Sequence, residues 1–197
     1  MRVSLRAIAA FMVILTVISL VPMTASAAAP LSGVYEGEGS FEWSLDKDTG
    51  VLTVECEGDM HDFGLYSYAP WYASRAYIRS VELSEGMKSI GDYAFYDCAK
   101  LTKIGFSSTL EGIGRYSFNK CTSLKAVDIP EGVTYIMAGA FLECFALSDI
   151  SIPQSLRSLE RDAFGFCPCD LSITRCWGRS GYRRELGHRR RYLDKYT

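Results

Sequence analysis

The stretch Ile90-Gly91-Asp92-Tyr93-Ala94-Phe95-Tyr96-Asp97-Cys98 decides the fold, because its pattern returns every 23 residues. The apolar columns that keep this spacing are Phe95, Phe118, Phe141 and Phe164; Cys98, Cys121, Cys144 and Cys167; Met87, Leu110, Val133 and Leu156; and Val81, Ile104, Val127, Ile150 and Ile173. A unit of this length cannot bury its apolar face alone, so successive units must stack on one another. The sequence therefore predicts a solenoid whose core contains the Phe and Cys columns.

Each unit has two halves with different spacing. In Leu124-Lys125-Ala126-Val127-Asp128-Ile129-Pro130, apolar residues two apart followed by Pro predict a short strand. The spacing of three in Ala-Phe-x-x-Cys-x-x-Leu predicts a turn of α- or 3₁₀-helix with Phe, Cys and Leu inward. We expect a half repeat at residues 78–89 and about four coils to residue 174, whose strands form a concave parallel sheet opposite these helical segments.

Residues 28–77 form an expected N-terminal cap. Alternation over residues 41–45 and 51–54, joined by the polar turn at 46–50, predicts a β-hairpin. The turn also resembles the start of an Asp-rich calcium loop, but Cys56 stands where an EF-type loop needs a carboxylate. Residues 59–77 are rich in aromatics, which we expect to cover the open end of the first coil. A carbohydrate platform of exposed tyrosines is the alternative.

The pattern resembles the BspA-like leucine-rich repeats of bacterial surface proteins. The resemblance rests on the Ala-Phe-x-x-Cys-x-x-Leu cores at residues 94–101 and 140–147, and on the Ile-x-Ile-Pro strand at residues 150–153. It covers about residues 40–173, including an entry region at 58–72. The departures are Ser117 for Ala, Met137 and Glu160 for Gly, and Asp170 for Leu. It implies a leucine-rich-repeat fold in a surface or secreted protein that takes part in adhesion or protein binding, with no shared catalytic apparatus.

Residues 1–27 are typical of a secretory signal peptide. Arg2 and Arg6 precede an apolar run at residues 7–21, and Ala25-Ser26-Ala27 is a small-residue cleavage site. The run of about 15 residues is shorter than the ~20 that span a bilayer. We therefore expect an exported protein that begins near Ala28, with no membrane span after signal removal.

Charge is distributed unevenly. Residues 28–174 hold 11 Lys/Arg and 21 Asp/Glu, whereas residues 175–197 hold 8 Lys/Arg and 2 acids. The acidic body argues against a nucleic-acid-binding scaffold. Three interpretations of the basic tail stay open: a degenerate cap helix at residues 181–193, a disordered tail, or a tail altered by a change of reading frame.

Four of the seven cysteines lie in the repeat column, where regular stacking favours buried free thiols over any one disulfide pairing. Cys56, Cys169 and Cys176 are the better candidates for oxidation in an exported protein. Cys167, Cys169, Cys176 and His188 offer a possible Cys₃His zinc site, but their irregular spacing favours a Cys169–Cys176 disulfide instead. We expect no metal and no cofactor.

The chain offers little for catalysis. His61 and His188 are its two histidines, and neither stands in a Ser-His-Asp or Cys-His arrangement. The sequence therefore predicts a non-enzymatic binding module for an unknown extracellular protein or glycan. The alternatives are attachment to an anionic cell-surface polymer through the basic tail and a hydrolase with its site in the cap.

The predicted binding face is the outward side of the strands, where solenoids usually bind. Its positions form three rows: Arg79, Thr102, Lys125 and Ser148; Ser80, Lys103, Ala126 and Asp149; and Glu82, Gly105, Asp128 and Ser151. The candidate ligand contacts among them are Arg79, Glu82, Thr102, Lys103, Lys125, Asp128, Ser148, Asp149 and Ser151.

Overall fold

The computed structural model describes residues 31–169. The expected signal peptide, the basic tail, and Asp170, Cys176 and His188 lie outside these residues. Within them, no helix is long and apolar enough to cross a membrane.

The described residues begin with three antiparallel strands, β1 (Leu31–Tyr35), β2 (Phe41–Asp46) and β3 (Val51–Cys56). The hairpin of β2 and β3 agrees with the expected turn at residues 46–50. Gly50 has a φ of 78°, which favours glycine, and its N–H donates to the Asp46 carbonyl at 2.7 Å. Strand β1, which contains the half-buried Gly33, was not one of the two strands that the alternation predicted.

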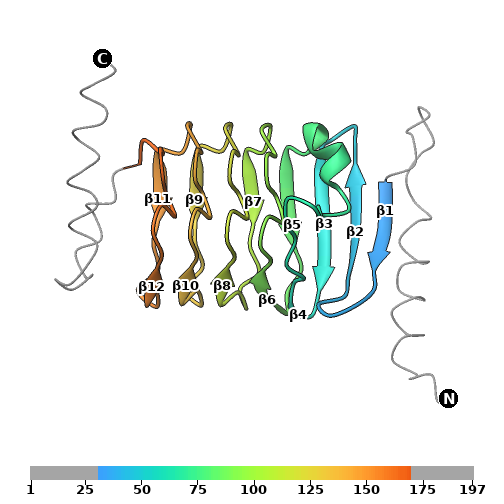
Figure 1. Ribbon diagram of the computed structural model, residues 1–197, viewed down its shortest axis with the longest axis horizontal. Helices are drawn as coiled ribbons and strands as arrows, with labels where there is room; N and C mark the ends of the chain where they lie inside the picture. The colour runs from blue at the N-terminus through green and yellow to red at the C-terminus, as the bar shows by residue number, and fades with distance from the viewer. Residues whose placement is uncertain (1–30, 170–197) are drawn as a thin grey trace, which may run out of the picture.

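The hairpin is part of the solenoid, because β3 pairs in parallel with β5 (Ser80–Leu83). Strand β5 in turn pairs with β7 (Lys103–Gly105), so one sheet has the order β1-β2-β3-β5-β7. Strands β9 (Ala126–Asp128) and β11 (Asp149–Ser151) continue the stack as a parallel pair (Figure 1). The predicted leucine-rich-repeat solenoid with parallel strands is confirmed.

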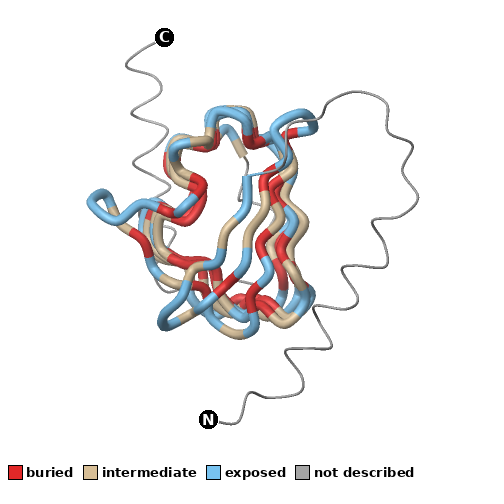
Figure 2. The backbone as a smooth tube through the Cα atoms, turned by 90° about the vertical axis from the view of Figure 1, so that its right-hand side faces the viewer, coloured by how far each residue is buried: buried red, intermediate tan, exposed pale blue. Residues whose placement is uncertain are grey.

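A second parallel sheet runs along another side of the coils. Its order is β12-β10-β8-β6-β4, from strands β4 (Gly58–Asp59), β6 (Met87–Ile90), β8 (Gly112–Ile113), β10 (Tyr135–Ile136) and β12 (Ser158–Leu159). Viewed end-on, the coils enclose a core lined by buried positions (Figure 2). Strands therefore also form at Ile90 and at its counterparts 23 residues apart, Ile113, Ile136 and Leu159, which the sequence pattern did not indicate.

The predicted helical segments opposite the strands are wrong in detail, because Ala-Phe-x-x-Cys forms a series of turns. Cys98 N–H still donates to the Phe95 carbonyl at 3.3 Å, but Tyr93 and Asp97 have φ values of 55° and 59°. These values interrupt a helix. The Phe95 N–H instead donates to Ser117 of the next coil at 2.7 Å, so backbone donors link coils. In the described chain the 3₁₀-helix η2 (Tyr72–Tyr77) lies in the cap.

The repeated phenylalanines stack as a continuous ladder of fully buried rings. Adjacent ring centroids in the series Phe95, Phe118, Phe141 and Phe164 are 5.1, 5.1 and 5.2 Å apart. Trp71 precedes them, 5.6 Å from Phe95, and its indole N–H donates to the Ala94 carbonyl at 2.8 Å. The cap thus covers the open end of the ladder with a tryptophan.

The repeated cysteines form a second ladder beside the rings. Cys98, Cys121 and Cys144 are buried free thiols. The Sγ atoms of Cys121 and Cys144 donate to phenylalanine carbonyls of the preceding coil, at 3.4 and 3.2 Å. Burial raises the pKa of Cys98 to about 12 and that of Cys121 well above its ordinary value, so these two thiols are protonated at neutral pH.

Candidate binding surface

All nine candidate ligand contacts on the strand face are exposed. The sheet register places Lys103 beside Ser80, Asp149 beside Ala126, and Ser151 beside Asp128. The same register places Thr53 of β3 beside Glu82, so the face extends into the hairpin. The sequence did not indicate this extension, because antiparallel strands carry no 23-residue repeat.

The row of residues that directly precedes the strands lies at one edge of this face. Arg79, Thr102, Lys125 and Ser148 directly precede β5, β7, β9 and β11. The Thr102 N–H donates to the Arg79 carbonyl at 2.8 Å, and the Ser148 N–H donates to the Lys125 carbonyl at 3.1 Å. Because parallel strands start at the same edge, these side chains are held side by side on successive coils.

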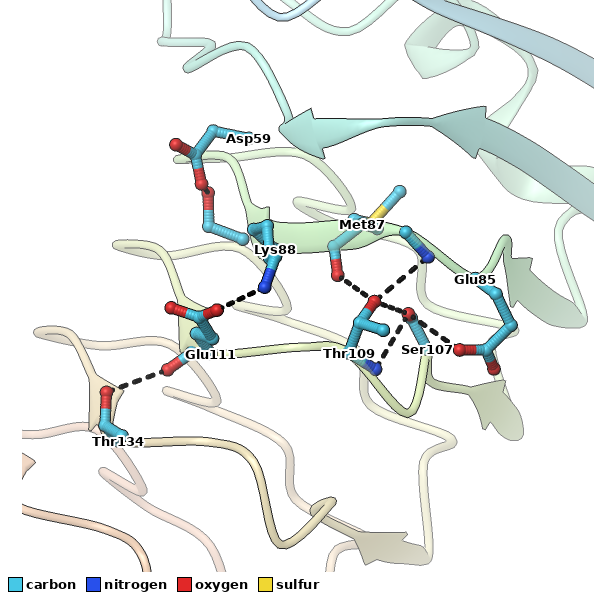
Figure 3. Close-up of polar contacts among 10 residues, drawn as sticks. Asp59, Glu85, Met87, Lys88, Ser107, Thr109, Glu111 and Thr134 are labelled. Carbon is cyan, nitrogen blue, oxygen red and sulfur yellow. Dashed lines mark hydrogen bonds and ion pairs between the residues drawn. The ribbon is translucent and has the colours of Figure 1, made fainter.

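The loops on the second-sheet side use their polar groups to join coils (Figure 3). The Glu85 carboxylate accepts from the Ser108 N–H at 3.1 Å and the Ser108 hydroxyl at 2.6 Å, and these bonds lower its pKa. Lys88 pairs with Glu111 at 2.5 Å. In the next pair of coils, Glu131 accepts from the Gln154 N–H at 3.1 Å. These carboxylates therefore hold neighbouring coils together.

A hollow of about 420 Å³ lies on the second sheet. Its lining residues are Asp59, Met60, Asp62, Ser89, Ile90, Asp92, Gly114, Arg115, Tyr135 and Met137. Asp62 and Asp92 each accept a backbone N–H of the following coil, at 2.8 and 2.5 Å. Burial raises the pKa of Asp92. Sequence reasoning missed this hollow, since its residues come from four successive coils spread over residues 59–137.

The cap aromatics divide into buried and exposed groups. Trp71 is fully buried, whereas Tyr66 and Tyr68 are exposed. The Tyr68 ring stacks on Tyr72 at 3.9 Å, and the Arg75 guanidinium lies over the same Tyr72 ring at 4.1 Å. The Tyr72 ring is thus covered by side chains of this protein rather than open as a stacking platform.

The cap histidine lies inside an aromatic cluster. The His61 ring is 4.7 Å from Tyr35 and 5.2 Å from Phe63. Among the described residues, no group of three or more His, Cys, Asp or Glu is arranged to hold a metal ion. The described residues of the alternative zinc set, Cys167 and Cys169, lie at the end of the last coil.

Short coils that bury a regular ladder and expose polar rows on parallel strands define a leucine-rich-repeat scaffold. The BspA type leucine rich repeat region matches residues 71–174 in six copies, which is more than half of the chain. The chain therefore belongs to the BspA type leucine-rich-repeat family. The repeats of this family are generally binding modules.

Two solved structures are similar to this chain. A leucine-rich repeat protein of T. pallidum is 20% identical with a TM-score of 0.52, covering 66% of this chain and 66% of that one. A leucine-rich repeat protein from Eubacterium ventriosum is 26% identical with a TM-score of 0.51, covering 66% of this chain and 40% of that one. The chain thus spans less than two thirds of each. No curated protein matches it.

Proposed function

We propose that this protein is an exported, non-enzymatic binding module that holds an extracellular protein or glycan on its strand face. The observation that carries the proposal is the set of polar rows in register along the strands, from the half-buried Thr53 to the exposed Ser151. Short side chains such as Ala126 and Ser151 leave room for a ligand surface to approach the backbone.

The chemistry of the described residues favours binding over catalysis. Cys98, Cys121 and Cys144 are buried. Burial raises the pKa of Cys98 and Cys121, so these two thiols are poor nucleophiles at neutral pH. His61 is engaged with aromatic rings rather than placed beside a serine or cysteine nucleophile. The expected signal peptide places such a module outside the cell or on its surface.

The test is binding of the purified mature protein to arrays of extracellular proteins and glycans. Ala126→Tyr puts a bulky neutral side chain on the strand face, and Ser158→Tyr puts the same side chain at an exposed position of the second sheet. We expect Ala126→Tyr to weaken binding to the array ligands at least about tenfold, the scale of losing an interface contact worth ~1.4 kcal/mol. Ser158→Tyr should bind as the unmodified protein does.

Two results would overturn the proposal. One is equal binding by both tyrosine variants. The other is a glycosidase, peptidase or esterase activity that persists through purification and disappears in His61→Ala. Removal of residues 175–197 tests the alternative, attachment through the basic tail, because tail-mediated binding would be lost together with its salt dependence.

A further inference from the structure

Basic residues gather where the parallel strands begin. We call the following set the cationic edge: Lys47, Arg75, Arg79, Lys100, Lys103, Lys120 and Lys125. These are seven of the eleven Lys and Arg in residues 31–169, a region with twenty Asp and Glu. A predominantly acidic body therefore concentrates its positive charge along one edge.

Aromatic rings hold three of these cations in place. Lys47 Nζ lies 5.0 Å from the centroid of the Tyr77 ring, and the Arg75 guanidinium lies 4.1 Å from that of Tyr72. Lys120 Nζ lies 5.7 Å from the centroid of the Tyr96 ring. These are the three cation–π contacts recorded in the described chain, and all fall on this edge. Cations fixed in this way lose less side-chain entropy when a ligand binds.

The central cations of the edge are not neutralised by carboxylates. Arg79, Lys103 and Lys125 are exposed, and none forms an ion pair among the described residues. Elsewhere on the edge Arg75 pairs with Asp97 at 3.0 Å. On the second-sheet side Lys88 and Arg115 pair with Glu111 and Glu160.

The stacking of the coils brings these unpaired cations close together. Successive coils lie ~4.8 Å apart, as neighbouring strands do. Arg79, Lys103 and Lys125 occupy three consecutive coils, so neighbouring backbones are nearer than the Debye length of ~8 Å. Their mutual repulsion is only partly screened, and a bound anionic chain would relieve it.

Hydroxyl groups alternate with the cations along the same edge. Thr102 lies between Arg79 and Lys125 in the row before the strands, and Ser80 pairs in register with Lys103. The Thr102 hydroxyl donates to the Arg79 carbonyl at 3.0 Å, which leaves its oxygen able to accept a hydrogen bond. Cations with interleaved hydroxyls match a polymer that carries both acidic groups and hydroxyls.

We propose that the cationic edge binds an acidic polysaccharide. This proposal rests on the proposed binding function. It names the class of glycan that would bind if the ligand is a glycan. Single-stranded nucleic acid fits less well, because it binds by stacking bases on open ring faces. The rings that contact the edge cations, those of Tyr72, Tyr77 and Tyr96, are each occupied on one face by a cation of this chain. Glu82 and Asp128 lie in the row next to the edge, and Asp149 ends the row that contains Lys103. These carboxylates would repel anions, which confines an acidic chain to the edge between Arg79 and Lys125.

The test compares two double variants of the full mature chain, both with the basic tail intact. The edge variant is Lys103→Ser with Lys125→Ser, which introduces the residues found one coil away at Ser80 and Ser148. The control is Arg157→Thr with Arg161→Ala, which introduces those found at Thr134 and Ala138. Each variant removes two positive charges, so the net charge is matched.

The probe is fluorescently labelled polygalacturonate, titrated at about 50 and 200 mM salt, a range over which counterion release is measurable. We expect the edge variant to bind the probe about tenfold or more weakly. The slope of log affinity against log salt concentration should fall in magnitude by about two, one for each lost charge contact. The control should stay within about twofold of the unmodified protein. Arg79→Thr, which introduces the residue at Thr102, provides an independent edge variant if the double variant fails to fold.

Four results would overturn the assignment. Equal losses in both double variants would mean that net charge governs binding, and no loss in either would place binding elsewhere. A single-stranded DNA oligonucleotide that binds as tightly as polygalacturonate, and that the edge variant weakens to the same extent, would mean that the edge binds polyanions in general. If polygalacturonate does not bind while Ala126→Tyr still abolishes binding to array ligands, this inference fails and the proposed function stands.

Discussion

At the scale of single residues, Ser117 carries a buried side-chain oxygen with no hydrogen-bond partner in the described chain. The same column holds Ala94, Ala140 and Ala163, all buried in the same turn. Ser117→Ala should therefore raise the free energy of unfolding by about 1 kcal/mol, because it removes a buried hydroxyl that no bond compensates. Equilibrium urea denaturation measures the change.

Ser107 is the matched control for this substitution. Its hydroxyl is equally buried but lies 2.7 Å from the Thr109 hydroxyl and donates to Glu85 at 3.4 Å. Ser107→Ala should therefore lower the free energy of unfolding by about 1 kcal/mol. The interpretation fails if both alanine variants shift stability in the same direction.

The buried thiols make stability depend on alkaline pH. Burial raises the pKa of Cys98 to about 12 and that of Cys121 well above the ordinary 9.0. A group whose pKa is higher in the folded state stabilises fully below its unfolded pKa and loses that contribution as pH rises through the folded pKa. Between about pH 9 and pH 12, stability should thus fall more steeply than in Cys98→Ala/Cys121→Ala. Parallel pH slopes in urea denaturation would contradict this.

At the scale of elements, the repeat columns predicted what lies inside each coil, but not how backbone donors are used. The strand before Pro130 and the turn at residues 46–50 follow directly from spacing and turn chemistry. The segment predicted as helical forms turns, because some of its N–H groups donate to carbonyls of the next coil. The sequence of a single repeat does not reveal these bonds between coils. The joining of β3 to β5 was also hidden, since β3 belongs to an antiparallel hairpin.

The sequence predicted which side chains of the strands are exposed, but not which contacts the cationic side chains make. Strand alternation alone put Lys103, Asp128 and Ser151 on the outward side, where the structure also exposes them. The cation–π contacts of Arg75 and Lys120 depend on tyrosines of neighbouring coils or of the cap. No sequence period marks such contacts, so the cationic edge emerges only from the fold.

Contact between the cap and the second sheet depends on Gly91. A Cβ at this position would overlap the carbonyl oxygen of His61, whereas later coils accommodate Met137 and Glu160 in the same column. Gly91→Ala should displace the cap segment and cost about 1–3 kcal/mol, as overpacking does. Gly64→Ala, where a Cβ meets nothing within 4 Å, is the control and should change stability by less than about 0.5 kcal/mol. Indistinguishable melting curves for the two variants would exclude this close contact.

At the scale of the whole molecule, the cap and the coils form one stack. Trp71 stacks on Phe95, and the ladder continues through Phe118 to Phe141 without a break. Short repeat arrays unfold cooperatively when each unit is held by its neighbours. The strand face from Thr53 to Ser151, and with it any extended ligand site, exists only if this stack is one body.

The most direct test of this claim is denaturant unfolding of Phe141→Ala, followed by two probes. In a Trp177→Phe background, tryptophan fluorescence reports Trp43 and Trp71 of the cap, while circular dichroism reports the whole stack. Loss of a buried ring should cost about 3–5 kcal/mol. We expect both transitions to shift together to lower denaturant, although Phe141 lies three rings from Trp71. A fluorescence transition that stays in place while the dichroism transition shifts would show that the cap folds separately, and would contradict the single stack.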